Sequence, residues 1–408
     1  QLRINPSRDL FNESIAKHII PNTMETIKKL MDRVNNNKLS IEERYPELNA
    51  TEEGRKNILF VSPMLNKQGL YRMILPALEL SETLRYNTII SQIIPDDYQK
   101  IIDDFHIKLV PELIRWADYI VFSANGQDLS SVINNLKDLN PKVKVVMDID
   151  RNYHALNINN YAAKKFSIEK QRNLERNIML VDYSTYPDFL TEDFYRKKVG
   201  MPIKSFILPN LLSPYQFEGF DRTIERPKNT DSKRRILLMA DVDDFDDINS
   251  FRDTINDVMV RCPESKIYVL GNGIQYENKN PLRFVNYTRV PFTSLFDYYQ
   301  IIWNMNPDLA IIPVKKQTFH RTYYKILELG VFGIPMVSMN EYPYNHLLKK
   351  DVHIMLNGQK RSFVSSVKTA LDSPEVRTQL SSLCKNYVMD KYTFLNNDML
   401  DSYFKIFN

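Results

Sequence analysis

The feature that most constrains the fold is a repeated alternation of short apolar runs with helix-length amphipathic segments. Short apolar runs separated by segments long enough for a crossover helix are typical of parallel βαβ units. The sequence therefore predicts a Rossmann-like domain over residues 55–217. Its strand candidates are the apolar runs at 58–61, 88–93, 119–122, 143–147, 179–181 and 206–208.

The same alternation restarts after a polar interval at 218–234, which has little that could fill a core and is therefore interpreted as a linker. A second Rossmann-like domain is predicted over residues 235–385. Two domains also suit a chain of 408 residues, because a single hydrophobic core rarely grows that large. The strand candidates of the second domain are 236–239, 267–270, 284–285, 309–312, 336–338 and 353–356.

Both ends of the chain carry helical patterns. Residues 1–54 contain isoleucine, leucine and methionine at helical spacing, which predicts a helical extension packed on the first domain. A peripheral membrane contact or a homo-oligomer contact through this helix is the alternative. A C-terminal helix is predicted over 386–408, where its return to the first domain would couple the two domains.

Composition excludes several classes of protein. The 54 basic and 50 acidic residues nearly balance, so nucleic acid is not expected as a partner. No run approaches the roughly 18 apolar residues that a membrane-spanning helix requires. Cys262 and Cys384 lack the spacing of a zinc site or a disulfide framework. These features favour a cytoplasmic protein, with association at the inner face of the membrane left open.

The most informative segment runs from 308 to 344. A buried strand at 309–312 is predicted to end at Pro313 and to open into a polar loop. A helix is then predicted to begin near Arg321 and to close at Gly333. Its N-terminus would lie at the carboxyl end of a strand, where backbone N–H groups and the helix dipole favour an anionic ligand such as a diphosphate.

Lys325 and Glu328 stand three residues apart in this helix and are predicted to share one polar face. A cation can neutralise diphosphate charge, and a carboxylate can accept two hydrogen bonds from ribose hydroxyls. A nucleotide site needs both residue types close together. The alternative is a solvated Lys/Glu pair, which is common on helix surfaces.

This segment resembles the donor-binding signature of GT-B glycosyltransferases, in particular those similar to glycosyltransferase family 4. The matching residues are Lys325, Glu328, Gly333, Pro335 and Val337. The resemblance implies that the lysine contacts the donor phosphate and the glutamate contacts the nucleotide ribose. It also implies a GT-B fold, in which two facing Rossmann-like domains enclose a cleft, and retention of the anomeric configuration.

Other segments follow the family's order. Gly271, Asn272 and Gly273 look like the G-x-G turn near the nucleotide, with a plain turn as the alternative. The segment 285–290 and the helix after it resemble the part that contacts the base. Pro209 and Asn210 resemble the P-N that closes the first domain.

In the first domain, the resemblance places the loop 62–72 against the donor phosphate or the acceptor. Gly69 would allow a close backbone approach and Arg72 would supply charge, with an ordinary surface arginine as the alternative. Asp148 and Asp150 follow the strand candidate 143–147, and His154 is nearby. An acid at a strand's carboxyl end could deprotonate the acceptor hydroxyl, so Asp150 and His154 are candidate catalytic residues together with Glu328.

The sequence departs from the family pattern in two places. Eight residues before Glu328, where the family often carries a glutamate, stands His320, which could donate a hydrogen bond to the sugar or phosphate. The R-x4-K phosphate clamp is also absent, because the acidic segment 241–244 takes its place. Arg321 is the candidate substitute, and Tyr324 is a further candidate for contact with the donor.

Together these patterns predict a glycosyltransferase that moves a sugar from a nucleotide-sugar donor to a glycan, lipid-linked or protein acceptor, as in polysaccharide biosynthesis. No metal or other cofactor is expected, because Asp148 and Asp150 have D-x-D spacing but belong to the first domain. A nucleotide-sugar epimerase of the same fold and a non-catalytic nucleotide- or sugar-binding module are the alternatives.

Overall fold

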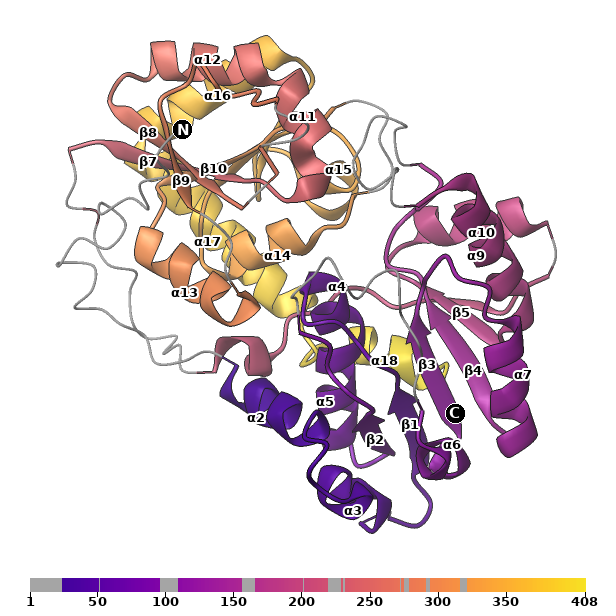
Figure 1. Cartoon of the computed structure of the whole chain (residues 1–408). Helices are drawn as coiled ribbons and strands as arrows, with labels where there is room; N and C mark the ends of the chain where they lie inside the picture. The colour runs from indigo at the N-terminus through magenta and orange to yellow at the C-terminus, as the bar shows by residue number, and fades with distance from the viewer. Residues whose placement is uncertain are drawn as a thin grey trace. The chain divides into compact units, whose positions relative to one another are not determined.

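The computed structural model describes residues 24–50, 52–95, 109–155, 166–200, 202–218, 229, 232–271, 273–274, 279–290, 294–315 and 321–408. The chain divides into two compact units (Figure 1). We call the first the N-terminal unit; it comprises Met24–His154, Phe166–Glu218 and Tyr392–Asn408. The C-terminal unit is built mainly from Gly219–Lys391.

The N-terminal unit is built on a six-stranded sheet in which every neighbouring pair is parallel, in the order β2-β1-β3-β4-β5-β6. The central strands are buried on both faces, as expected for a parallel sheet covered by helices. The order changes direction between β1 and β3. The strands are β1 (Lys56–Phe60), β2 (Tyr86–Ile90), β3 (Tyr119–Ser123), β4 (Lys144–Asp148), β5 (Tyr183–Tyr186) and β6 (Ser205–Ile207).

Helices fill the crossovers between these strands, and further helices precede β1 and follow β6 in the chain (Figure 1). They are α2 (Glu25–Val34), α3 (Ile41–Arg44), η1 (Pro46–Leu48), α4 (Lys67–Gly69), η2 (Leu70–Ile74), α5 (Leu75–Glu82), α6 (Pro111–Trp116), α7 (Ser130–Leu139), α9 (Ile168–Leu180), α10 (Phe189–Val199), η3 (Pro214–Phe217) and α18 (Asn397–Phe404).

The described part of the N-terminal extension packs on the chain that follows β2. The Asn35 side chain donates to the Ile93 carbonyl at 2.6 Å and accepts from the Ile93 N–H at 3.0 Å. The Tyr45 hydroxyl donates to the Ser91 carbonyl. Residues 24–50 are therefore part of the N-terminal unit rather than a separate domain, and residues 1–23 lie outside the described residues.

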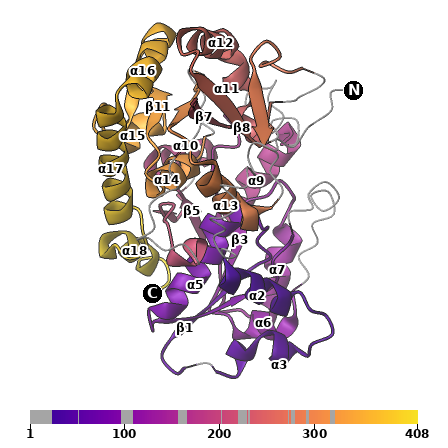
Figure 2. The ribbon, with the colours of Figure 1, turned by 90° about the vertical axis from the view of Figure 1, so that its left-hand side faces the viewer.

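The end of the chain also belongs to the N-terminal unit. The Leu212 N–H donates to the Tyr392 carbonyl at 2.7 Å, and the Tyr119 hydroxyl donates to the Asn408 carbonyl at 2.6 Å. Figures 1 and 2 show α18 beside α5. The predicted boundary at 386 falls inside α17 (Pro374–Lys391), so the segment that joins the N-terminal unit begins at Tyr392.

The C-terminal unit has a second all-parallel six-stranded sheet, in the order β12-β11-β10-β7-β8-β9. Counted from β7, this is the Rossmann order, in which the direction of winding reverses between β7 and β10. The strands are β7 (Arg234–Met239), β8 (Ser265–Leu270), β9 (Tyr287–Val290), β10 (Leu309–Ile312), β11 (Met336–Met339) and β12 (Met355–Asn357).

The remaining elements of this unit are helices. They are η4 (Val242–Asp244), α11 (Phe245–Ser250), α12 (Arg252–Arg261), α13 (Leu295–Met305), α14 (Tyr324–Val331), α15 (Tyr344–Leu347), α16 (Lys360–Asp372) and α17. The first strand of the unit begins at Arg234, the last residue of the predicted linker, most of which lies outside the described residues. No helix in the described ranges combines the length and apolar character needed to cross a membrane.

Two strand candidates were wrong. Residues 179–181 end the amphipathic helix α9, and Met179 and Leu180 are partly exposed there. The strand is instead β5, whose buried positions include Ser184 and Thr185, so it lacks an apolar run. Residues 284–285 precede β9, and Phe284 is 79% exposed. The last candidate, 353–356, overlaps β12 only in part.

Candidate functional site

A small pocket lies at the carboxyl ends of β7 and β10, where the strand order of the C-terminal unit reverses. Ligands of open α/β sheets bind at this position. Its free volume is about 10 Å³, so its own side chains nearly fill it. The lining residues are Met239, Asp244, Asp247, Ile248, Ile311, Ile312, Pro313, Lys325, Leu329 and Tyr344.

A larger groove of about 220 Å³ lies in the N-terminal unit, near the residues that begin β4 and β5, Lys144 and Tyr183. It is at the amino ends of these strands, away from the edge at which parallel sheets bind their ligands. We therefore take the smaller pocket as the candidate site, in spite of its size.

Lys325, the second residue of α14, reaches into this pocket. Its Nζ forms an ion pair with the Asp244 carboxylate and lies 3.4 Å from the Met239 carbonyl oxygen. Its side chain is 12% exposed. Burial disfavours the ammonium form, but the Asp244 and Asp241 carboxylates raise the pKa of Lys325 above its ordinary value. Lys325 is therefore positively charged and already paired.

Arg321 precedes α14 and is held by Asp247. Its Nε lies 3.0 Å from Asp247 Oδ2, and a terminal nitrogen donates to Asp247 Oδ1 and, at 2.8 Å, to the Lys315 carbonyl. Asp247 Oδ1 also accepts from the Lys315 N–H at 2.7 Å. This bidentate pair connects the loop after β10 to α11.

Asp244 has an unusual environment for a carboxylate. Its Oδ2 accepts from the Asp241 N–H at 2.7 Å as well as from Lys325. Burial raises the pKa of Asp244 to about 6, with Asp241 and Asp247 adding to the rise and Lys325 opposing it. The pKa of Asp244 is therefore shifted towards neutral pH.

Glu328 does not share a polar face with Lys325, so this expectation was wrong. Its carboxylate is fully buried and accepts from the Tyr298 hydroxyl at 2.9 Å and the Tyr299 hydroxyl at 3.2 Å. Six of the eight residues of α14 are buried. Residues three apart differ in direction by about 60° around a helix, which lets Lys325 enter the pocket while Glu328 meets α13. Glu328 is 0% exposed, so a contact with ribose would require the side chains that cover it to move.

The two glycines of the predicted G-x-G turn are needed because the turn lies against the backbone of residues 240–241. Gly271 has φ +114°, and a Cβ there would lie 2.4 Å from the Ala240 carbonyl oxygen. A Cβ on Gly273 would lie 1.8 Å from the Asp241 carbonyl oxygen. The turn after β8 thus packs against the chain that leaves β7. Asn272 and His320 lie outside the described residues, and the Tyr324 side chain is buried.

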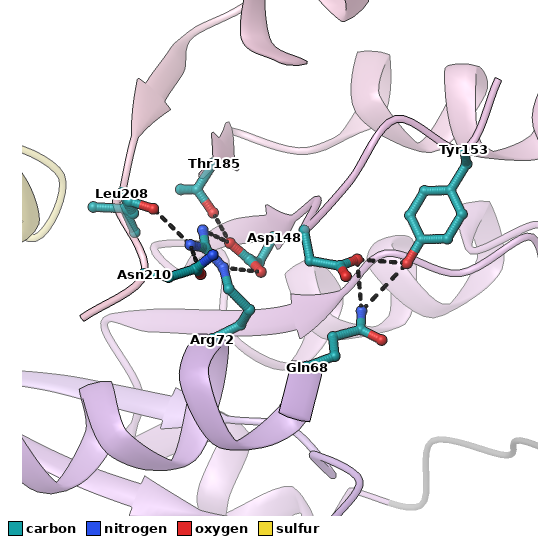
Figure 3. Close-up of polar contacts among 8 residues, drawn as sticks. Gln68, Arg72, Asp148, Tyr153, Thr185, Leu208 and Asn210 are labelled. Carbon is teal, nitrogen blue, oxygen red and sulfur yellow. Dashed lines mark hydrogen bonds and ion pairs between the residues drawn. The ribbon is translucent and has the colours of Figure 1, made fainter. Parts of the chain in front are cut away.

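Arg72 was expected to offer its charge to a ligand, and the structure corrects this (Figure 3). Its guanidinium makes two bonds to the Asp148 carboxylate, at 2.9 and 2.6 Å, and the two side chains are only 1% and 3% exposed. It also donates to the Leu208 carbonyl at 2.6 Å and to Asn210 Oδ1 at 2.9 Å. Arg72 therefore ties η2 to β4 and to the chain after β6.

Asp150 was expected to act as a base, and its buried carboxylate is part of a hydrogen-bonded network. Its Oδ1 accepts from the Tyr153 hydroxyl at 2.5 Å and from Gln68 Nε2 at 3.0 Å, and its Oδ2 accepts from Arg151 Nε at 2.9 Å. Donors from Tyr153, Gln68 and Arg151 therefore hold the Asp150 carboxylate in place, and its role as a base stays a prediction.

His154 and Gly69 also make close contacts within the N-terminal unit. The His154 Nε2 lies 2.7 Å from Glu175 and the Nδ1 lies 3.2 Å from the Tyr195 hydroxyl. Burial lowers the pKa of His154, although Glu175 opposes the shift. A Cβ on Gly69 would lie 1.8 Å from the Met64 carbonyl oxygen, so this glycine serves the turn of its own loop.

Sequence reasoning missed the pairing of Lys325 and Arg321 with Asp244 and Asp247. The available signal was the run 241–247, which has five aspartates among seven residues directly after β7. An acidic run at the predicted ligand-binding end of the strands indicates that cations nearby will be paired, although it does not indicate which carboxylate each cation meets. Within the described ranges, no group of three or more His, Cys, Asp or Glu side chains is arranged to hold a metal ion.

No protein-family model matches the sequence, and no curated protein matches it. Solved structures are similar in fold. Sucrose-phosphate synthase from Thermosynechococcus elongatus has a TM-score of 0.58 at 10% identity, over 86% of this chain and 99% of that one. Anabaena HepE in complex with UDP and glucose has a TM-score of 0.57 at 11% identity, over 86% and 100%.

A putative UDP-N-acetylglucosamine 2-epimerase from Listeria monocytogenes has a TM-score of 0.51 at 9% identity, over 87% of this chain and 98% of that one. At these identities the similarity establishes the fold alone. The chain has the α/β fold of the GT-B glycosyltransferases, with a six-stranded parallel sheet in each of its two units.

Proposed function

We propose that this chain transfers a glycosyl group from a nucleotide-sugar donor to a glycan, lipid-linked or protein acceptor. The observation that carries the proposal is the position of Lys325, a charged side chain at the strand-order reversal of the C-terminal sheet. The fold is shared with a structure solved in complex with UDP and glucose, which supports the same ligand class here.

In this proposal, Lys325 and Arg321 contact the diphosphate of the donor. When the bond between the sugar and the diphosphate breaks, negative charge grows on the departing nucleotide. Cations fixed at that position stabilise the transition state more than the ground state. The proposed reaction needs no metal ion and retains the anomeric configuration.

The test is direct measurement of donor binding and turnover. Calorimetry of the full chain against a panel of nucleotides and nucleotide-sugars should find a ligand that Lys325→Met binds at least about tenfold more weakly than the wild type. This corresponds to a loss of about 1.4 kcal/mol in binding free energy. Lys368→Met, which removes an exposed lysine of the same unit, is the matched control. Equal binding by both variants, or no binding of any nucleotide by the wild type, would refute the proposal.

A nucleotide-sugar epimerase is the second candidate, because a putative enzyme of that kind shares the fold. An epimerase converts the donor sugar without any acceptor, whereas a transferase forms a new linkage only when an acceptor is present. NMR of the products with and without acceptor separates the two, and the anomeric signal of a transfer product shows whether configuration is retained. Ligand binding with no conversion in either case would indicate a binding module.

A further inference from the structure

Both cations proposed to hold the donor are already paired with carboxylates of the protein. Lys325 contacts Asp244, and Arg321 makes a bidentate pair with Asp247. These two aspartates line the pocket at the strand-order reversal. A carboxylate resembles a phosphate in charge and in the way its oxygens accept hydrogen bonds from ammonium and guanidinium groups.

Among the described residues, the two proposed phosphate-binding cations are already paired, and the free volume of the pocket is too small for a diphosphate. The segment 241–247 contributes five aspartates, which outnumber Lys325, Arg321 and Lys315, the cations among the described residues that interact with them. A diphosphate would add negative charge to a site that already has an excess of it. The free volume of about 10 Å³ is that of roughly one water molecule, so side chains must move before a ligand can enter.

We propose that Asp244 and Asp247 are internal counter-anions that occupy the phosphate-binding groups of Lys325 and Arg321, so that a donor diphosphate binds only by displacing them. This inference rests on the proposed function for the identity of the ligand. In the empty site, both aspartates act as positioning residues, because they fix the two cations at the strand-order reversal. They also lower the affinity for diphosphates, since each must give up its cation.

Asp244 is the better residue to test. Asp247 also accepts from the Lys315 N–H, so replacing it would disturb the loop after β10. Asp244→Asn keeps the shape of the side chain and an oxygen that can accept from the Asp241 N–H. The matched control is Asp246→Asn, which removes one negative charge from the same segment at a residue that is outside the pocket lining.

Calorimetry of the full chain with inorganic pyrophosphate and with UDP measures the effect. Asp244→Asn should bind both probes about tenfold more tightly than the wild type, and Asp246→Asn should stay within about twofold. An equal gain in both variants would show a general charge effect and overturn the proposal. Unchanged or weaker binding by Asp244→Asn, or no pyrophosphate binding by any of the three proteins, would overturn it as well.

A second measurement needs only the wild type. The diphosphate of UDP-glucose keeps a constant charge between pH 7.5 and 5.5, whereas burial raises the pKa of Asp244 to about 6, which lies inside this range. Lys325, Asp241, Asp247 and Tyr344 are the charged or titratable groups that face Asp244. Affinity for UDP-glucose should rise several-fold as the pH falls, and an affinity that is flat or falls with decreasing pH would contradict the proposal.

The two hypotheses fail in different ways. If pyrophosphate binding follows the expected order among the variants but no nucleotide-sugar is turned over, the counter-anions stand and the transferase proposal fails. If nucleotide-sugars are turned over and Asp244→Asn binds them no more tightly than the wild type, the transferase proposal stands and the proposal that Asp244 is a counter-anion is refuted.

Discussion

The buried pair Arg72–Asp148 gives the sharpest prediction for stability. Arg72→Met removes a guanidinium that makes four hydrogen bonds, two to Asp148 and one each to Leu208 and Asn210. The Asp148 carboxylate would keep the Thr185 hydroxyl, at 2.6 Å, but would lose its counter-charge in a site from which water is excluded. Breaking a buried ion pair in this way costs about 3–5 kcal/mol, so the N-terminal unit should lose a large part of its stability.

Urea unfolding followed by tryptophan fluorescence can assign this loss to the right unit. The chain has two tryptophans, Trp116 in α6 of the N-terminal unit and Trp303 in α13 of the C-terminal unit. In a Trp303→Phe background, Trp116 reports on the N-terminal unit alone. The midpoint of its unfolding should shift strongly with Arg72→Met, whereas the Trp303 signal in a Trp116→Phe background should not move.

The control for this experiment is Arg176→Met, which removes an exposed arginine paired with Asp128 in the same unit. That pair is screened by water, so the midpoint should stay unchanged. Arg72→Met combined with Asp148→Leu should cost less than Arg72→Met alone, because no buried charge is then left unpaired. A loss below about 1 kcal/mol for Arg72→Met would refute the assignment of Arg72 to a buried structural pair.

Glu328, Gly273 and His154 each give a further prediction. Tyr298→Phe removes the hydroxyl that donates a hydrogen bond to Glu328 and should destabilise the C-terminal unit by about 1–3 kcal/mol in urea unfolding. If Glu328 instead binds the ligand, the same substitution should weaken nucleotide binding and leave stability unchanged. Gly273→Ala should destabilise that unit and weaken UDP binding, because the new Cβ would collide with the Asp241 carbonyl oxygen. The control Gly358→Ala should be tolerated, because no atom lies within 4 Å of its new Cβ, and equal effects of the two substitutions would contradict this account. Burial lowers the pKa of His154 in the folded state below its ordinary value of 6.5, so the unfolded state binds the proton more readily. The contribution of neutral His154 to the stability of the N-terminal unit is therefore present above pH 6.5 and is lost as the pH falls below it. The Trp116 unfolding midpoint should therefore fall between pH 7.5 and 5.5, and His154→Gln should show a smaller fall.

Much of the fold could be predicted because buried parallel strands are apolar along their length. β1, β3, β4, β7 and β10 all coincide with apolar runs that the sequence displays plainly. β5 could not be found in this way, since its sequence is YSTY and its polar side chains are satisfied inside the unit, as when Thr185 donates to Asp148. Helix α9 ends in apolar residues just before β5, which moved the predicted strand into the helix.

The candidate site was predictable only in part. The position of Lys325 after a buried strand follows from the local pattern and the strand order. Its ion pair joins residues 81 positions apart, and that of Arg321 joins residues 74 positions apart. No local pattern indicates which carboxylate a cation will meet over such a separation.

The sequence by itself determined two series of parallel βαβ units and the end of the second sheet's strands at which a ligand is expected, because apolar periodicity and the succession of strands and helices along the chain are local properties. Tertiary structure alone decided which polar side chains stay open to a ligand. Arg72 and Glu328 read as candidate ligand-binding side chains in the sequence, but their partners come from distant segments and both side chains are buried in the fold. Burial and pairing depend on which elements pack together, and packing is settled only when the whole unit has folded.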